Sequence, residues 1–210
     1  MRKAIAILSW LLVIGGGIFM WRGGSDYWKS VSGQKEEALH WENQNPEGTS
    51  SDASPVGNAM FQQAQLSRAG LARQGSRYER GESIAKLSIP RLNTTLYVLE
   101  GTGDKDLKRG PGHMEGTVMP GAGGNCVIAG HRDTHFRVLK NIAKGDEIVV
   151  QSREGTYKYR VTGMSVVAPE NTDSLQPTAK GVLNLITCFP FDYVGSAPRR
   201  FVVHADLIQS

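Results

Sequence analysis

From Ser83 onward the chain consists of short runs of strand-forming residues separated by turn-forming residues. The first run, 84–89, alternates apolar and polar side chains and ends at Pro90, which has no N–H to donate to a strand ladder. Six further runs follow at 94–99, 125–130, 147–151, 157–167, 182–187 and 201–207. Residues 136–142 favour one or two helical turns. Seven short strands with little helix predict a mainly β domain, folded as a barrel or a sandwich.

Many of the glycines and prolines fall between residues 101 and 124, which predicts a series of turns there. The Gly-rich stretches 109–113 and 120–124 resemble a phosphate cradle at first sight. They have neither the GxGxxG nor the GxxxxGK[ST] spacing, and no helix is expected after them. We therefore interpret the segment as turns and predict no cofactor.

The charge and cysteine content exclude several classes of protein. The net charge of +4 and the pI of about 9.1 are mildly basic, and Lys and Arg are spread along the chain. A nucleic-acid-binding face would need a concentrated basic patch, so no nucleic-acid partner is predicted. Cys126 and Cys188 are the two cysteines. Two cysteines are not a disulfide framework, and without a His/Cys cluster at ligand spacing no metal site is expected.

Residues 4–21 form an uncharged run of 18 residues after Arg2 and Lys3. A helix of that length is about 27 Å long, enough to cross a hydrocarbon core. Trp10 and Trp21 resemble interfacial anchors. A cleaved signal peptide is the alternative, but Gly23-Gly24-Ser25 is a poor cleavage site. We predict a single-pass plasma-membrane anchor with its N-terminus in the cytoplasm and the β domain outside.

Residues 22–80 are rich in Ser, Gln, Asn, Gly and Glu, and predict a polar linker. A weak helix is possible at 59–73, where a few apolar residues are loosely spaced. This segment is interpreted as a spacer, with packing on the domain as the alternative. Residues 81–210 remain as the β domain, the part of the chain in which any catalytic site is expected.

Three of the predicted strands end in, or begin with, reactive or charged residues. The run 182–187 leads into Cys188, the run 125–130 leads into His131, and Arg200 precedes the last run. A lone cysteine is more often an inert buried thiol. A thiol beside a base and a cation is different, because these groups activate it and stabilise an oxyanion. Together the three residues make a chemically complete set.

The same residues resemble the sortase family. The resemblance rests on Ala-Gly-His at 129–131, Leu-Ile-Thr-Cys at 185–188 and an Arg opening the last strand, in this order along the chain. It covers roughly residues 81–208. Gly-His-Arg-Asp-Thr at 130–134 and the run 195–203 look closest to class D and class D-like sortases. The resemblance implies a closed β-barrel of about eight strands, so one more strand is expected, within 101–124 or from a split of 157–167.

The resemblance also implies a cysteine transpeptidase. Cys188 would be the nucleophile, His131 the general acid/base, and Arg200, in preference to Arg199, the group that orients substrate and stabilises the oxyanion. Sortases cleave an LPxTG-type C-terminal sorting signal, hold the chain as a thioester and pass it to an amine. The expected partners are exported proteins with such a signal and an amine acceptor, a cell-wall peptide or a protein lysine. No metal is needed.

Three other residues are predicted to be non-catalytic. Cys126 lies about 16 Å before His131 along the strand, too far to reach Cys188, so it is expected to be a buried reduced thiol. His113 is predicted to make structural hydrogen bonds, and His135 to be incidental. The loop 168–181 is where we expect specificity to be set.

Two other functions remain open. One is a different cysteine enzyme, a plain peptidase or an L,D-transpeptidase-like protein. The latter has its histidine a few residues before its cysteine, a pattern absent around Cys188. The other is an inactive, anchored β-domain that binds peptide.

Overall fold

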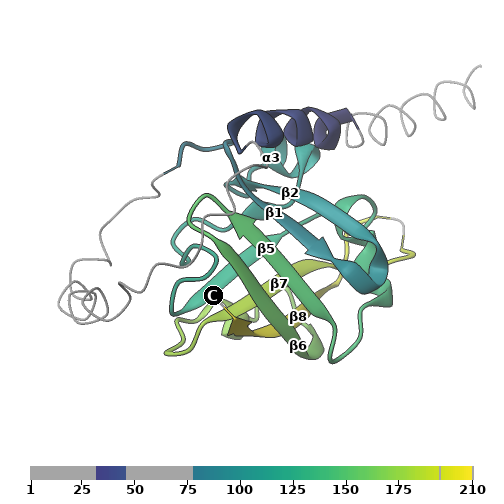
Figure 1. The fold of residues 1–210 in the computed structure, drawn as a ribbon. Coiled ribbons are helices and arrows are strands. Elements are labelled where there is room, and N and C mark those ends of the chain that lie inside the picture. The colour runs from purple at the N-terminus through teal and green to yellow at the C-terminus, as the bar shows by residue number, and fades with distance from the viewer. Residues whose placement is uncertain (1–31, 46–77, 194, 210) are drawn as a thin grey trace, which may run out of the picture.

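Eight strands close into a barrel in the computed structural model, which describes residues 32–45, 78–193 and 195–209 (Figure 1). The barrel order is β1-β2-β3-β4-β7-β8-β6-β5. The strands are β1 (Ser83–Ile89), β2 (Thr94–Glu100), β3 (Gly112–His113), β4 (Asn125–Ala129), β5 (Glu147–Ser152), β6 (Thr156–Val167), β7 (Val182–Phe189) and β8 (Arg199–Gln209). All seven strand predictions are confirmed. Of the two predicted architectures, the structure is a closed barrel and not a sandwich.

The eighth strand lies within 101–124, one of the two places where the resemblance led us to expect it, and the same segment holds a short helix that the turn residues did not predict. The helix α3 (Asp104–Arg109) has acidic residues in its first turn and basic residues in its last, which suits the helix dipole. The strand β3 follows, running parallel to β2 and antiparallel to β4. A side chain at Gly112 would meet the carbonyl oxygen of Gly101 at 2.0 Å, so this close approach requires glycine. Gly112 is thus one of the glycines that indicated turns, and it is also the residue that allows β3 to pair closely with its neighbours.

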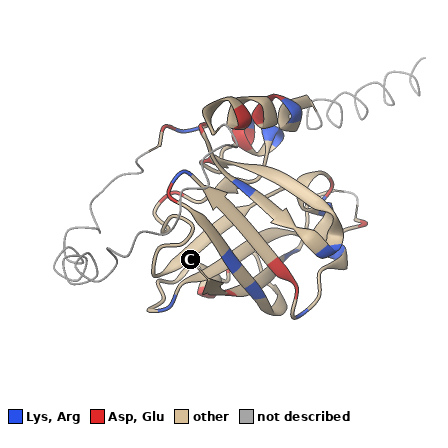
Figure 2. Ribbon diagram, viewed as in Figure 1, with Lys and Arg blue, Asp and Glu red and all other residues tan. Residues whose placement is uncertain are grey.

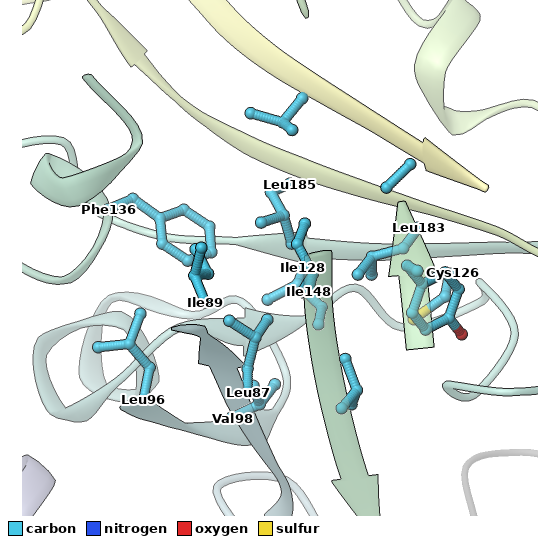
Figure 3. Packing of buried hydrophobic residues seen from close by; sticks show 14 of the residues in the cluster. Leu87, Ile89, Leu96, Val98, Cys126, Ile128, Phe136, Ile148, Leu183 and Leu185 are labelled. Atoms are coloured by element: carbon cyan, nitrogen blue, oxygen red, sulfur yellow. The ribbon is translucent and has the colours of Figure 1, made fainter. Parts of the chain in front are cut away.

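Alternating side chains from the strands fill the barrel interior. Figure 3 shows Leu87, Ile128, Ile148 and Leu185 meeting there from β1, β4, β5 and β7. The 3-10 helix η3 (His135–Asn141), at the position predicted for a helical turn, adds Phe136 to the same core. Two shorter 3-10 helices, η2 (Pro90–Leu92) and η4 (Asp173–Leu175), lie in connections between strands.

Residues 32–44, which we assigned to the polar linker, are helical and pack beside α3 (Figure 1). Gly33, Glu37 and Trp41 are buried at a four-residue spacing, so they form one stripe of the helix. The Gln34 side-chain amide bonds to both backbone groups of Tyr97 in β2. It accepts from the Tyr97 N–H at 2.8 Å and donates to Tyr97 O at 3.2 Å. This stripe contains one large apolar residue, so hydrophobic periodicity gave no signal for it.

The predicted anchor at 4–21 and the predicted weak helix at 59–73 lie outside the described residues. Within the parts of the chain that the structure describes, no helix has the length and apolar character needed to cross a membrane. Figure 2 shows acidic and basic residues interspersed over the face in view.

Candidate active site

Cys188 lies near the end of β7, on the outer face of the barrel. Leu183 and Leu185 belong to the core, and side chains alternate along a strand, so Ile186 and Cys188 point away from the core. The thiol-bearing residue is half-buried. The strand therefore fixes the cysteine backbone and leaves its side chain accessible from outside the barrel.

Arg200 is the direct partner of Cys188 in the antiparallel pairing of β7 with β8. Directly opposed residues have Cβ atoms about 4.5–5.5 Å apart and share one face of the sheet. Arg199 is opposite Phe189 and is exposed, whereas Arg200 is half-buried. The Arg200 guanidinium donates to the carbonyl oxygens of Ala197 at 3.3 Å and Arg199 at 3.1 Å. Of the two arginines, Arg200 is thus the one on the side of Cys188.

His131 follows β4, the strand on the other side of β7. The two strands are parallel, with Ala129 opposite Ile186, and Gly130 N–H continues the ladder by donating to Ile186 O at 3.0 Å. The Thr187 hydroxyl donates to Gly130 O at 2.7 Å. Continuing this register by two residues places His131 beside Cys188. The half-buried His131 and Arg200 thus come from the two strands that neighbour β7.

Gly130 is required for this local structure. A side chain there would come within 2.7 Å of the Phe136 ring, which is fully buried under the turn after β4. The Phe136 N–H donates to His131 O at 2.9 Å and closes that turn. The core thus holds the backbone of His131 in place.

Arg132 joins the turn after β4 to the loop after β7, a contact that the sequence did not predict. Its guanidinium donates to the carbonyl oxygens of Pro190, Tyr193 and Gly195 at 3.1, 2.7 and 2.9 Å. It also lies over the Tyr193 ring, 5.7 Å from the centroid. Asp192 in the same loop pairs with Lys140 of η3 at 2.5 Å. The segments that carry His131 and follow Cys188 are therefore held together. The only sequence signal was an arginine directly after the histidine.

The two remaining candidate histidines are structural. His113 is buried, with Nδ1 at 2.8 Å from a Glu100 carboxylate oxygen and Nε2 at 3.1 Å from Val118 O, as predicted. His135 is also buried, and burial lowers its pKa to about 4. It is therefore neutral at neutral pH.

Cys126 is a buried free thiol, which confirms its prediction. It is opposite Leu183 in the β4–β7 register and lies with it in the core (Figure 3). Cys188 is five residues further along β7, so the two sulfur atoms cannot pair. Burial, together with the nearby Glu100 charge, raises the pKa of the Cys126 thiol, which keeps it protonated and unreactive.

The loop between β6 and β7 covers part of the same outer face. A cavity of about 260 Å³ lies between this loop and the strands β4, β7 and β8. Asp173, Ser174, Asn184 and His204 are among its lining residues. Asn184 shares the outward-facing side of β7 with Cys188.

Comparison with known proteins settles the family. Residues 87–208, more than half of the chain, match the model of the sortase domain family. The chain belongs to the sortase family. It is 35% identical to sortase D of Bacillus subtilis (strain 168) over 127 residues, 60% of this chain and 64% of that relative. The match thus spans a little less than two thirds of the relative's length. The resemblance to class D is confirmed.

Solved sortase structures have the same fold. A Clostridium perfringens sortase D5 transpeptidase superposes with a TM-score of 0.64 at 23% identity, covering 84% of this chain and 99% of that one. Sortase C from Clostridium perfringens, solved with the C-terminal cell wall sorting motif, gives 0.58 at 26% identity, covering 64% and 75%. Sortases as a family are cysteine transpeptidases.

Proposed function

We propose that this chain is a membrane-anchored sortase that cleaves an LPxTG-like C-terminal sorting signal and transfers the exported protein to an amine. The observation that carries the proposal is that Cys188 lies on β7, between the strand that carries Arg200 and the strand that leads into His131. Arg200 is its direct partner on β8, and the β4 register leads His131 to its other side. A thiol flanked by a base and a fixed cation is suited to acyl transfer.

In the first half-reaction the Cys188 sulfur, as thiolate, attacks the carbonyl carbon of the scissile Thr–Gly or Thr–Ala bond. Arg200 stabilises the oxyanion that develops on the carbonyl oxygen. When the C–N bond breaks, His131 gives its proton to the departing amine. The product is a thioester between the substrate threonine and Cys188.

In the second half-reaction an acceptor amine attacks the thioester carbonyl. His131, now neutral, takes the proton that this amine loses, and the C–S bond breaks to release Cys188 as thiolate. The new bond is an amide. The enzyme returns to its starting protonation state without any net oxidation or reduction.

The N-terminal part of the chain supports a location at the membrane surface. We propose that residues 4–21 anchor the protein in the plasma membrane, with the N-terminus in the cytoplasm and the barrel outside, separated by a polar linker within 22–80. The substrates would be exported proteins with a sorting signal, as in the Clostridium perfringens sortase C structure with its sorting motif. The acceptor would be an amine of a cell-wall peptide or a protein lysine.

The test uses a fluorogenic sorting-signal peptide with and without a primary amine. We expect wild-type protein to cleave the peptide and to shift its product from acid to amide when amine is added. Cys188→Ala should abolish both products, whereas Cys126→Ala, which removes the other thiol, should keep them. Cleavage by the Cys188→Ala variant would exclude the thioester mechanism. If the product is entirely acid at every amine concentration, the protein is a peptidase without transferase activity.

A further inference from the structure

The loop 168–181 is held against the barrel through two of its backbone carbonyl groups. The Asn125 amide nitrogen, from the start of β4, donates to Ser174 O at 2.8 Å and to Gln176 O at 2.9 Å. The Asn184 amide nitrogen, from β7, donates to Ser174 O at 3.1 Å. Both asparagine side chains therefore hold the same turn of the loop.

These contacts fix the orientation of both asparagine amides, because a backbone carbonyl can only accept. With its nitrogen facing Ser174 O, Asn184 also donates to Asn125 Oδ1 at 2.7 Å. Its own Oδ1 is then the atom 2.7 Å from His204 Nδ1. That oxygen is an acceptor, so His204 must carry a proton on Nδ1.

The other ring nitrogen of His204 completes the chain. Nε2 lies 2.9 Å from Ser165 Oγ, and a neutral ring with its proton on Nδ1 accepts here from the hydroxyl. Burial lowers the pKa of His204, which favours this neutral form. Hydrogen bonds thus run in one direction from Ser165 through His204 and Asn184 to Asn125, across the four neighbouring strands β6, β8, β7 and β4.

This chain of residues lies under the cavity and away from the reacting atoms. Asn184 and His204 line the cavity together with Ser174 and Asp173 of the loop. Asn184 is four residues before Cys188 on the same face of β7, a separation of about 13 Å. The four residues can therefore influence the shape of the cavity through the loop without contacting the scissile bond.

We propose that Ser165, His204, Asn184 and Asn125 are positioning residues that fix the 168–181 loop and thereby determine which sorting signals the enzyme accepts. The proposal rests on the sortase function proposed above. Because the network acts on the loop, its loss changes substrate binding and selectivity more than the chemical step. The residues that flank Cys188 keep their positions when the loop is released.

The test compares full-length wild-type protein with Asn184→Asp, His204→Ala and His204→Asn. Asn184→Asp has the same shape but places an acceptor against Ser174 O, and His204→Ala removes the donor to Asn184. For both we expect KM for an LPxTG-type peptide to rise roughly tenfold with kcat within about twofold. A panel of peptides varied at the first two positions should be cleaved less selectively. His204→Asn keeps an N–H near Nδ1 and should restore most of the wild-type KM.

Hydrogen exchange gives a second readout that does not depend on turnover. Backbone amides of residues 172–176 should exchange about tenfold faster in Asn184→Asp and His204→Ala, with exchange in β7 unchanged. Glu170→Ala is the matched control, because Glu170 is exposed on the same loop. It should alter neither KM nor exchange of the 172–176 amides.

Unchanged KM, selectivity and exchange in both disrupting variants would overturn the positioning role. If Asn184→Asp fails to fold, His204→Ala and Ser165→Ala carry the same expectations. Failure of the proposed function looks different: wild-type protein would then cleave no peptide of the panel, while the exchange experiment would still report whether the network holds the loop.

Discussion

Arg200 and Cys188 are direct partners in the antiparallel pairing of β8 with β7, so their side chains leave the sheet on the same face. Arg199, one residue earlier, is opposite Phe189 and exposed. This one-residue difference separates an arginine on the side of Cys188 from one that faces solvent.

Replacing Arg200 by Lys should therefore lower kcat for peptide cleavage by about 10²–10³, because an ammonium lacks the forked donor geometry of guanidinium. Arg199→Lys keeps an exposed positive charge and is the matched control, expected to change kcat less than about threefold. Steady-state kinetics on one sorting-signal peptide measures both. Equal losses in the two variants would contradict the assignment of Arg200.

Arg132→Lys should loosen the loop 190–198 without removing any group that touches substrate. One lysine ammonium cannot span the three carbonyl oxygens that Arg132 holds at 2.7 to 3.1 Å. We expect kcat/KM to fall roughly tenfold and amide exchange in residues 191–197 to accelerate, since two or more hydrogen bonds are lost. Arg137→Lys, at an exposed residue paired with Asp192, provides the control. Unaltered exchange in Arg132→Lys would show that the loop is held by other contacts.

The two thiols should differ sharply in reactivity. Cys188 is half-buried at the site, whereas Cys126 is buried in the core with a raised pKa. Iodoacetamide at pH 8 should modify one thiol per native molecule and two per molecule in guanidinium chloride, as counted by mass spectrometry. Peptide mapping should locate the native label on Cys188. Native labelling of Cys126 would mean that the barrel opens readily at β4.

His135 should make the protein less stable as the pH falls from 6.5. Its pKa is lowered from 6.5 to about 4 in the folded protein, chiefly by burial, while the hydrogen bond to the Lys108 backbone opposes the shift. Between these two values the unfolded chain binds a proton that the folded chain does not. Protonation of His135 should therefore lower the free energy of unfolding by up to roughly 1.4 kcal/mol per pH unit between these two pKa values. Above pH 6.5 this residue should contribute no pH dependence.

Urea unfolding at pH 7.0, 5.5 and 4.5 measures this effect, with His135→Gln as the comparison. Glutamine keeps an N–H donor but cannot bind a proton in this pH range. The free energy of unfolding of the variant should therefore decline less steeply below pH 6.5 than that of the wild-type protein. Parallel pH dependence of the two proteins would mean that His135 is accessible to protonation in the folded state.

The pattern of strand-forming and turn-forming residues predicted seven of the strands, because each of these seven is a recognisable run within a short stretch of the chain. Residues 84–89 alternate and stop at Pro90, and the apolar run 182–187 ends at Cys188. Strand β3 gave no such signal, because its two residues are Gly112 and His113 and its pairing depends on the backbone of Gly101. The helix at 32–44 was missed for a similar reason: its buried stripe is Gly33, Glu37 and Trp41, and its partners are α3 and β2.

The sequence by itself determined the order of the strands along the chain and the three residue types at the site, Cys188, His131 and Arg200. Only the tertiary structure decided that β4 and β8 flank β7, which pairs Arg200 directly with Cys188 and brings the end of β4, before His131, to the same strand. It also showed the Arg132 contacts and the chain of hydrogen bonds under the loop 168–181. The pairing of β4 with β7 brings together residues that lie 57 positions apart in the chain, as the register partners Ala129 and Ile186 do. Local propensity carries no information about such pairings, because they depend on the register of strands that are distant in the sequence.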